Sequence, residues 1–184
     1  MAAGSVVQSA DAGFDQFRLY ATDSSGNLTA STIAVDNFRI YTAADLGGDI
    51  HPGEATEAGG WQQMNLDSAT SAQYPVTHGY QSPSYPAWRA FNGGSANIGQ
   101  AWWTLSGSTA ADSWVNLEIA AGTIVPRSFK VSVIPYFSGC GGFKIYGNSG
   151  AAADTSSTLL GSYTDIDGLG SGTVGVSLTI NYSG

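Results

Sequence analysis

The sequence predicts an all-β fold, built as an antiparallel β-sandwich, and three observations support this. Short runs of β-branched and aromatic residues alternate with polar residues and end in Gly, Asn, Asp or Ser. No segment keeps a helical period of apolar residues over three turns. The 184-residue chain also has 25 glycines and only 11% charged residues, which is unusual for a helical protein and typical of many short strands separated by turns.

The first two predicted strands are near copies of each other, Phe17-Arg-Leu-Tyr20 and Asn37-Phe-Arg-Ile-Tyr41. The segment 23–27, Asp-Ser-Ser-Gly-Asn, supplies a turn between them, so we expect the two strands to pair as antiparallel neighbours. A third version, Phe143-Lys-Ile-Tyr146, follows much later in the chain. In each copy an aromatic and an aliphatic residue face one side, while Arg or Lys and Tyr face the other. Amphipathic strands of one sandwich explain the three copies more simply than a sequence repeat does.

Two irregular stretches lie between these strands and the second half of the chain. Residues 43–60 are small, acidic and glycine-rich, which predicts a surface loop. Residues 73–86 combine three prolines with several aromatic residues, and a proline-stiffened loop presents ring area at little entropic cost. The sequence therefore predicts an amino-terminal arm over 1–13 and one domain over 14–184, with a long loop region over 43–86.

From residue 101 onward the strand pattern becomes regular, with turn residues between successive runs. We expect strands over 102–105, 113–119, 128–134, 142–146, 157–160 and 174–180. Strands at this spacing without intervening helices favour a sandwich or barrel over a parallel α/β sheet. Trp102, Trp103 and Trp114 are expected in the core, because successive strand residues point to opposite faces and at least one tryptophan must point inward.

Charge and cysteine content exclude several functional classes. The chain has 6 basic and 14 acidic residues, a net charge of −8, and its basic residues are scattered, so no nucleic-acid partner is expected. The single cysteine, Cys140, allows no intrachain disulfide. The amino terminus lacks a basic start and a long apolar run, and no stretch approaches membrane-span length. We therefore expect a protein made in a cytoplasm without a leader and without membrane insertion.

The sequence contains no motif typical of a catalytic centre, so we expect no enzyme. It has neither a Gly-x-Ser-x-Gly nucleophile motif nor a phosphate-binding glycine loop, and His51 and His78 occur in unrelated loops. One cysteine and two isolated histidines also fall short of a zinc site. A glycosidase pair stays open, because carboxylates are numerous, but no spacing selects among the candidates Glu54, Glu57, Asp112 and Glu118.

Four motifs follow one another in the second half of the chain: Ala90-Phe-Asn-Gly-Gly94 ahead of Trp102-Trp103, Trp114-Val-Asn-Leu-Glu-Ile119, Ile124-Val-Pro-Arg-Ser-Phe-Lys-Val131, and Phe143-Lys-Ile-Tyr-Gly-Asn-Ser149 with Leu159-Leu160. In this order they resemble a discoidin-like (galactose-binding-like) domain, the fold of coagulation-factor C domains, many bacterial carbohydrate-binding modules and modules of phage tail proteins. The individual motifs are degenerate, so their order supplies the specificity. The resemblance implies a jelly-roll β-sandwich.

The resemblance also implies a ligand site on loops at one end of the sandwich. In such domains an aromatic face stacks on a sugar ring, and nearby Arg, His or Asn side chains bind its hydroxyls. The candidate carbohydrate-binding residues here are His78, Tyr80, Tyr85, Trp88 and Arg89, with Trp61 as an outlying candidate. Two alternatives to sugar binding stay open. In the first, Trp88 is buried beside the motif that begins at residue 90. In the second, the tyrosines contact a neighbouring subunit.

In many relatives acidic residues beside the ligand-binding edge hold a structural calcium ion. The corresponding positions are Asp36 and Asn92, where Asn92 is neutral and stands in place of the usual aspartate. This departure weakens the ligand set. We therefore expect no cofactor, with a structural calcium at Asp36 and Asn92 as the alternative.

The resemblance, together with the acidic, low-lysine composition, implies a structural virion protein of a tailed bacteriophage. It would be a tail, baseplate or capsid-decoration component that assembles with other virion proteins and with copies of itself. Adhesion to host-surface polysaccharide is a further role that the resemblance implies. The alternative is a carbohydrate-binding module of a bacterial surface or secreted protein.

Overall fold

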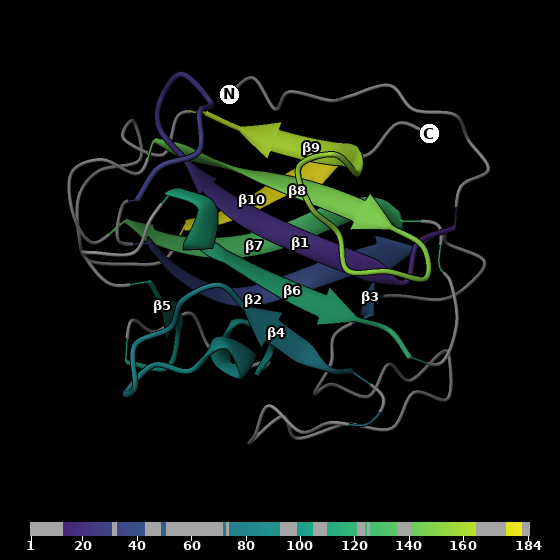
Figure 1. Cartoon of the computed structure of the whole chain (residues 1–184), viewed down its shortest axis with the longest axis horizontal. Coiled ribbons are helices and arrows are strands. Elements are labelled where there is room, and N and C mark those ends of the chain that lie inside the picture. Colours follow the sequence, from purple (N-terminus) through teal and green to yellow (C-terminus); the bar gives the residue numbers. More distant parts are fainter. Residues whose placement is uncertain are drawn as a thin grey trace.

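The computed structural model describes residues 13–30, 33–42, 49–50, 72, 74–92, 99–104, 110–120, 124, 126–135, 141–164 and 176–181. Within these ranges the chain forms ten β-strands and two 3-10 helices, with no α-helix, so the predicted all-β class is confirmed (Figure 1). The strands are β1 (Gln16–Thr22), β2 (Ile33–Thr42), β3 (Asp49–Ile50), β4 (Val76–His78), β5 (Trp102–Trp103), β6 (Trp114–Glu118), β7 (Pro126–Pro135), β8 (Gly142–Asn148), β9 (Thr158–Tyr163) and β10 (Val176–Asn181). The 3-10 helices are η2 (Ala87–Phe91) and η3 (Ala110–Asp112).

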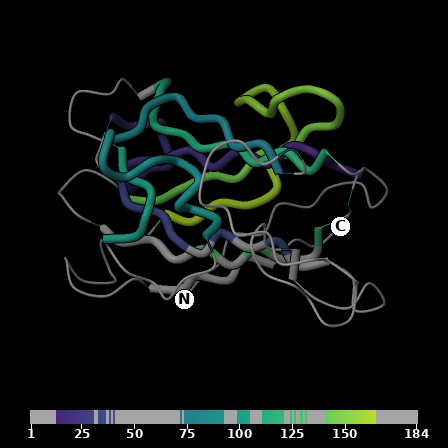
Figure 2. Tube along the Cα trace, turned by 90° about the horizontal axis from the view of Figure 1, so that it is seen from below, coloured from purple at the N-terminus to yellow at the C-terminus, as the bar shows by residue number. Residues whose placement is uncertain are grey.

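The strands form two antiparallel sheets. The first has the order β4-β6-β1-β8-β9, and the second has the order β10-β7-β2-β3, with β5 pairing to β2 beside this path. Figure 2, turned by 90° from Figure 1, shows purple β1 above blue β2, on the other side of the core. Within the described part of the chain, no helix is both long and apolar enough to cross a membrane.

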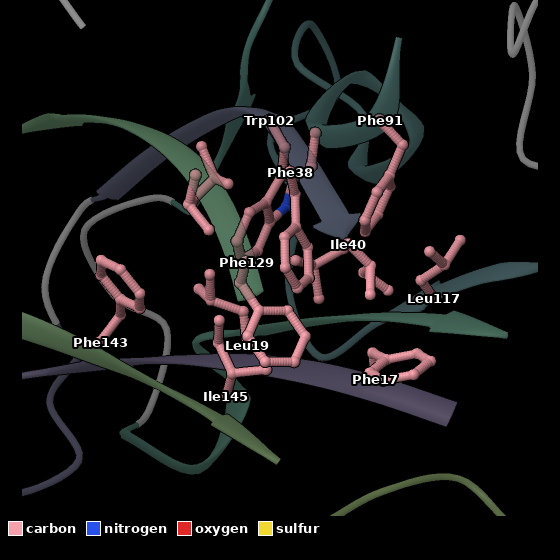
Figure 3. Packing of buried hydrophobic residues seen from close by; sticks show 14 of the residues in the cluster. Phe17, Leu19, Phe38, Ile40, Phe91, Trp102, Leu117, Phe129, Phe143 and Ile145 are labelled. Atoms are coloured by element: carbon pink, nitrogen blue, oxygen red, sulfur yellow. The ribbon is translucent and has the colours of Figure 1, made fainter. Parts of the chain in front are cut away.

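The two sheets share one hydrophobic core. Phe17 from β1 meets Phe129 from β7 with ring centroids 6.1 Å apart, and Phe129 in turn lies 6.2 Å from Phe38 of β2. All three side chains have no exposed surface. Figure 3 shows how aromatic and aliphatic side chains from both sheets interlock in this cluster. The period-2 alternation of the strands therefore gives each sheet one face that is buried against the other.

The tryptophan prediction is confirmed for one residue of the three. Trp102 is fully buried in the main core, where Figure 3 shows it beside Phe38. Trp103, its neighbour on β5, is only partly buried and packs with Ala34 and Ala101 in a separate small cluster. Trp114 is also partly buried, in another cluster with Tyr20 and Tyr146.

The strands expected after residue 101 are present as β5 to β10, with β5 shorter than predicted. Two further strands lie where loops are expected, because β4 falls inside 73–86 and β3 inside 43–60. The remaining parts of these predictions lie outside the described residues: the arm over 1–12, most of 43–73, and the side chains of His51, Glu54, Glu57, Trp61 and Cys140.

The expected pairing of the first two strands is wrong. Strand β1 pairs with β6 and β8 in the first sheet, whereas β2 pairs with β7, β3 and β5 in the second. The turn at 23–27 forms, with Asp23 Oδ1 accepting the backbone N–H groups of Ser25 and Asn27 at 2.8 Å each. After one antiparallel bridge between Thr22 and Leu28, the chain crosses to the other sheet. The amphipathic pattern shows which face of a strand is buried, and it does not identify the neighbouring strand.

Candidate functional site

Residues 79–86, which we call the segment after β4, are held to both sheets by backbone hydrogen bonds. The N–H of Gly79 donates to the carbonyl of Trp114 in β6 at 3.1 Å. Further along, the N–H of Ser82 donates to the carbonyl of Trp103 at 3.0 Å, and the N–H of Trp103 donates to the carbonyl of Tyr85 at 3.3 Å. Because β6 and β5 belong to different sheets, this segment connects the first sheet to the second. These hydrogen bonds therefore hold the backbone of the segment in a defined position relative to both sheets.

Three of the predicted carbohydrate-binding residues come together where this segment leads into η2. The ring of Tyr85 stacks on that of Trp103, with centroids 4.1 Å apart and an interplanar angle of 10°. The guanidinium carbon of Arg89 lies 5.7 Å from the ring centroid of Tyr85 and 5.7 Å from that of Trp88. We call these four residues, Tyr85, Trp88, Arg89 and Trp103, the aromatic–arginine group. Trp103 is a member that the sequence assigns to the core.

Tyr80 lies on the same segment. Among the described residues it is the large apolar residue that is exposed, with 38% of its surface accessible to solvent. Its backbone carbonyl accepts a hydrogen bond from the indole N–H of the buried Trp102 at 3.2 Å. The core therefore fixes the backbone at Tyr80, while the ring stays accessible. No ring contact within the described residues joins Tyr80 to the aromatic–arginine group.

Trp88 lies on η2 and is partly buried against the main core, so the alternative that it packs beside the residue-90 motif holds for part of its surface. Its neighbours Ala87, Ala90 and Phe91 are buried. Phe91 reaches Phe38 of the second sheet with a centroid distance of 5.4 Å. η2 is thereby fixed to the core and leaves Arg89 on its outer side.

His78 differs from the expected loop position, because it ends strand β4. It lies opposite Val115 in β6, and Val115 is fully buried, so His78 shares the core-facing side of the sheet. Its Nδ1 atom is buried without a hydrogen-bond partner among the described residues. Burial lowers the pKa of His78 from its ordinary value of 6.5, because desolvation penalises the charged imidazolium.

This environment predicts a pH-dependent stability. The folded state favours neutral His78, whereas the unfolded chain takes up a proton near pH 6.5, so the free energy of unfolding falls as the pH drops below 6.5 toward the lowered folded-state pKa. Urea unfolding between pH 8 and pH 5.5 measures this slope in the wild type and in His78→Gln. We expect a shallower slope in the variant, and parallel curves would contradict the assignment.

The two candidate calcium ligands, Asp36 and Asn92, both have a structural place in the fold. Asp36 is fully buried on β2, opposite Ser132 of β7. Asn92 follows η2 as its C-cap, and its Nδ2 donates to the carbonyl of Gln100 at 3.2 Å, while Arg89 Nη1 donates to the adjacent carbonyl of Gly99 at 2.9 Å. These two bonds hold the chain at residues 99–100 against η2. The described residues contain no cluster of three or more His, Cys, Asp or Glu side chains that could bind a metal ion.

A second group of polar and aromatic side chains, which the sequence does not single out, covers the outward face of the first sheet. Its centre is Arg18 of β1, whose guanidinium carbon lies 3.6 Å from the ring centroid of Trp114. Tyr20, Asn116 and Tyr146 surround it. The available signal was the shared pattern of the three near-copy strands, which places Arg or Lys and Tyr on the face away from the core.

Glu118 lies at the end of this outward face, half-buried and opposite Gln16 of β1, while Asp112 belongs to η3.

Comparison with known proteins adds no relative, since no family model, no curated protein and no solved structure matches the chain.

Proposed function

We propose that this chain is a non-enzymatic binding and assembly module, a discoidin-like jelly-roll β-sandwich that serves as a structural virion protein of a tailed bacteriophage and adheres to host-surface glycan. The observation that carries the proposal is the exposed Tyr80 on the segment after β4, beside the aromatic–arginine group that this segment, η2 and β5 bring together. Sugar rings have apolar faces that pack on aromatic side chains, and their hydroxyls accept hydrogen bonds from a guanidinium.

The arrangement of the sheets supports the sandwich part of the proposal. Two antiparallel sheets contribute side chains to one core, and the antiparallel ladders join strands far apart in sequence, as in β1 with β8 and β2 with β7. Non-local pairing of this kind is typical of sandwiches with crossing connections. A rigid sandwich with function on its rim suits both particle assembly and adhesion.

A carbohydrate-binding module of a bacterial surface or secreted protein is the second candidate. The accessible ring of Tyr80, carried on a backbone that Trp102 fixes, favours it. Mass measurement in solution and a glycan-array screen of the purified chain separate the two. Rings or trimers support the virion component, a glycan-binding monomer supports the module, and a monomer that binds no glycan contradicts both.

Tyr80→Ala tests the glycan surface directly. Truncating an aromatic anchor of a binding site costs about 2 kcal/mol, which is roughly a 30-fold weaker Kd. Because Tyr80 is 38% exposed, we expect the free energy of unfolding to change by only about 0.5 kcal/mol. Isothermal titration with the best glycan from the array measures the affinity.

The matched control is Tyr80→Phe, which keeps the ring and removes the hydroxyl. If stacking dominates, Tyr80→Phe retains most of the affinity, and Trp88→Ala weakens binding as well. Unchanged affinity in Tyr80→Ala would remove this surface as the glycan site.

A further inference from the structure

The outward face of the first sheet carries a nearly buried arginine. Arg18 is 9% exposed and lies at the middle of β1, opposite Asn116 of β6 on one side and Tyr146 of β8 on the other. Side chains of directly opposed residues point to the same face of an antiparallel pair, so Arg18 stands at the centre of a group of residues from three strands. This position holds its guanidinium in a defined place.

Neutral side chains make all the contacts of this guanidinium within the described residues. It lies over the indole of Trp114, while Nε donates to Asn116 Oδ1 at 3.4 Å and Nη1 donates to the hydroxyl of Tyr20 at 3.2 Å. Asn116 Nδ2 donates in turn to Gln16 Oε1 at 3.0 Å. The network therefore orients the guanidinium plane and supplies no negative charge.

A cation in this position is incompletely compensated. Stacking on an indole offsets part of the desolvation of a guanidinium, but a buried charge is usually matched by an opposite one. Arg18 Nη2 makes no hydrogen bond to the described residues. Arg18 as a whole keeps 9% of its surface exposed, and Trp114 beside it is only partly buried. A cation that is held in place with hydrogen-bond donors left over is the arrangement that binds an oxyanion.

We infer that Arg18 anchors a binding site for a sugar that carries one carboxylate group, such as a uronic acid. The planar fork of a guanidinium matches a carboxylate. The net charge of −8 disfavours ligands with many negative charges, and Glu118 lies on the same face.

The surroundings favour a hydroxyl-rich ligand over an apolar one. Thr77, opposite Asn116 on the edge strand β4, is exposed, and Asn148, opposite Gln16 on β8, is half-exposed. These neutral side chains offer donors and acceptors for hydroxyl groups. Trp114 is itself partly exposed and adds ring surface. The site uses none of the residues of the aromatic–arginine group, so it stands or falls independently of the proposed function.

Titration with sodium glucuronate tests the site, followed by ¹H–¹⁵N NMR and tryptophan fluorescence at constant ionic strength. Glucose, which lacks the carboxylate, and sodium acetate, which lacks the ring, are the matched probes. We expect saturable binding of glucuronate, at least tenfold tighter than that of either matched probe, with a shift of the Arg18 Nε–H resonance. Arg18→Gln should weaken glucuronate binding at least tenfold.

The control variant is Lys144→Gln, which removes one positive charge from the same face. Lys144 points toward the turn at 23–27, since a Cβ built on Gly26 would lie 3.7 Å from its Nζ. Unchanged binding in this control together with loss in Arg18→Gln supports the site. No saturable binding to the wild type, or acetate binding as tight as glucuronate binding, overturns it. If Arg18→Gln does not fold, an Arg18 Nε–H resonance that stays unmoved in saturated wild type overturns it as well.

Discussion

Replacing Trp102 with alanine is expected to destabilise the protein by about 4 kcal/mol, because it removes a large aromatic side chain and leaves a cavity. The indole has no exposed surface and lies among core residues from both sheets (Figure 3). Its N–H also donates to the carbonyl of Tyr80 at 3.2 Å, so the variant releases the backbone of the segment after β4. Urea unfolding followed by far-ultraviolet circular dichroism measures the loss.

The neighbouring residue supplies the control. Trp103 has the same side chain on the same strand, but it is only partly buried and contacts Tyr85 by stacking. We expect Trp103→Ala to cost about 1 to 2 kcal/mol, since part of its surface already meets water. Equal losses in the two variants would contradict the placement of Trp102 in the core and Trp103 beside the surface.

The sequence predicts strands and buried faces well, because both depend on local alternation. Phe17, Leu19, Phe143 and Ile145 occupy the inward positions that their period-2 pattern requires, and all four are fully buried. Which strands pair depends instead on where the chain passes from one sheet to the other. Phe17–Tyr20 and the 37–41 copy have nearly the same pattern, yet one pairs with β8 and the other with β7. A local pattern cannot distinguish a hairpin from a pair of strands that face each other across a core.

The site residues show the same division. Tyr85, Trp88 and Arg89 lie close in sequence and meet in the structure, so sequence proximity was enough to group them. Trp103 joins them through strand pairing and stacking, which no local motif reveals. Arg18 and Trp114 are brought together from positions 96 residues apart, 114 minus 18, by the register that places Tyr20 opposite Trp114. Contacts across a sheet become visible only once its register is known.

Gly79→Ala is expected to cost about 3 kcal/mol, because the added methyl group has no space. A Cβ built on Gly79 meets the backbone carbonyl and Cα of Asp112 and lies 2.5 Å from Nε1 of Trp114. Backbone atoms cannot rotate away as a flexible side chain would, so the segment after β4 must move off η3 and the start of β6. That movement strains the 3.1 Å hydrogen bond from the Gly79 N–H to the Trp114 carbonyl and displaces Tyr80.

Gly150→Ala is the control that separates this steric effect from the general effect of replacing a glycine. Gly150 has a φ of +78°, and a Cβ there meets nothing within 4 Å, so its only cost is the left-handed backbone, about 1 kcal/mol. Glycan affinity should fall in Gly79→Ala, because the support of Tyr80 moves, and should stay unchanged in Gly150→Ala. Urea unfolding and titration of both variants measure the two effects. A Gly79→Ala protein as stable as Gly150→Ala would mean that the segment after β4 does not lie against β6, and the binding surface built on that contact would fall with it.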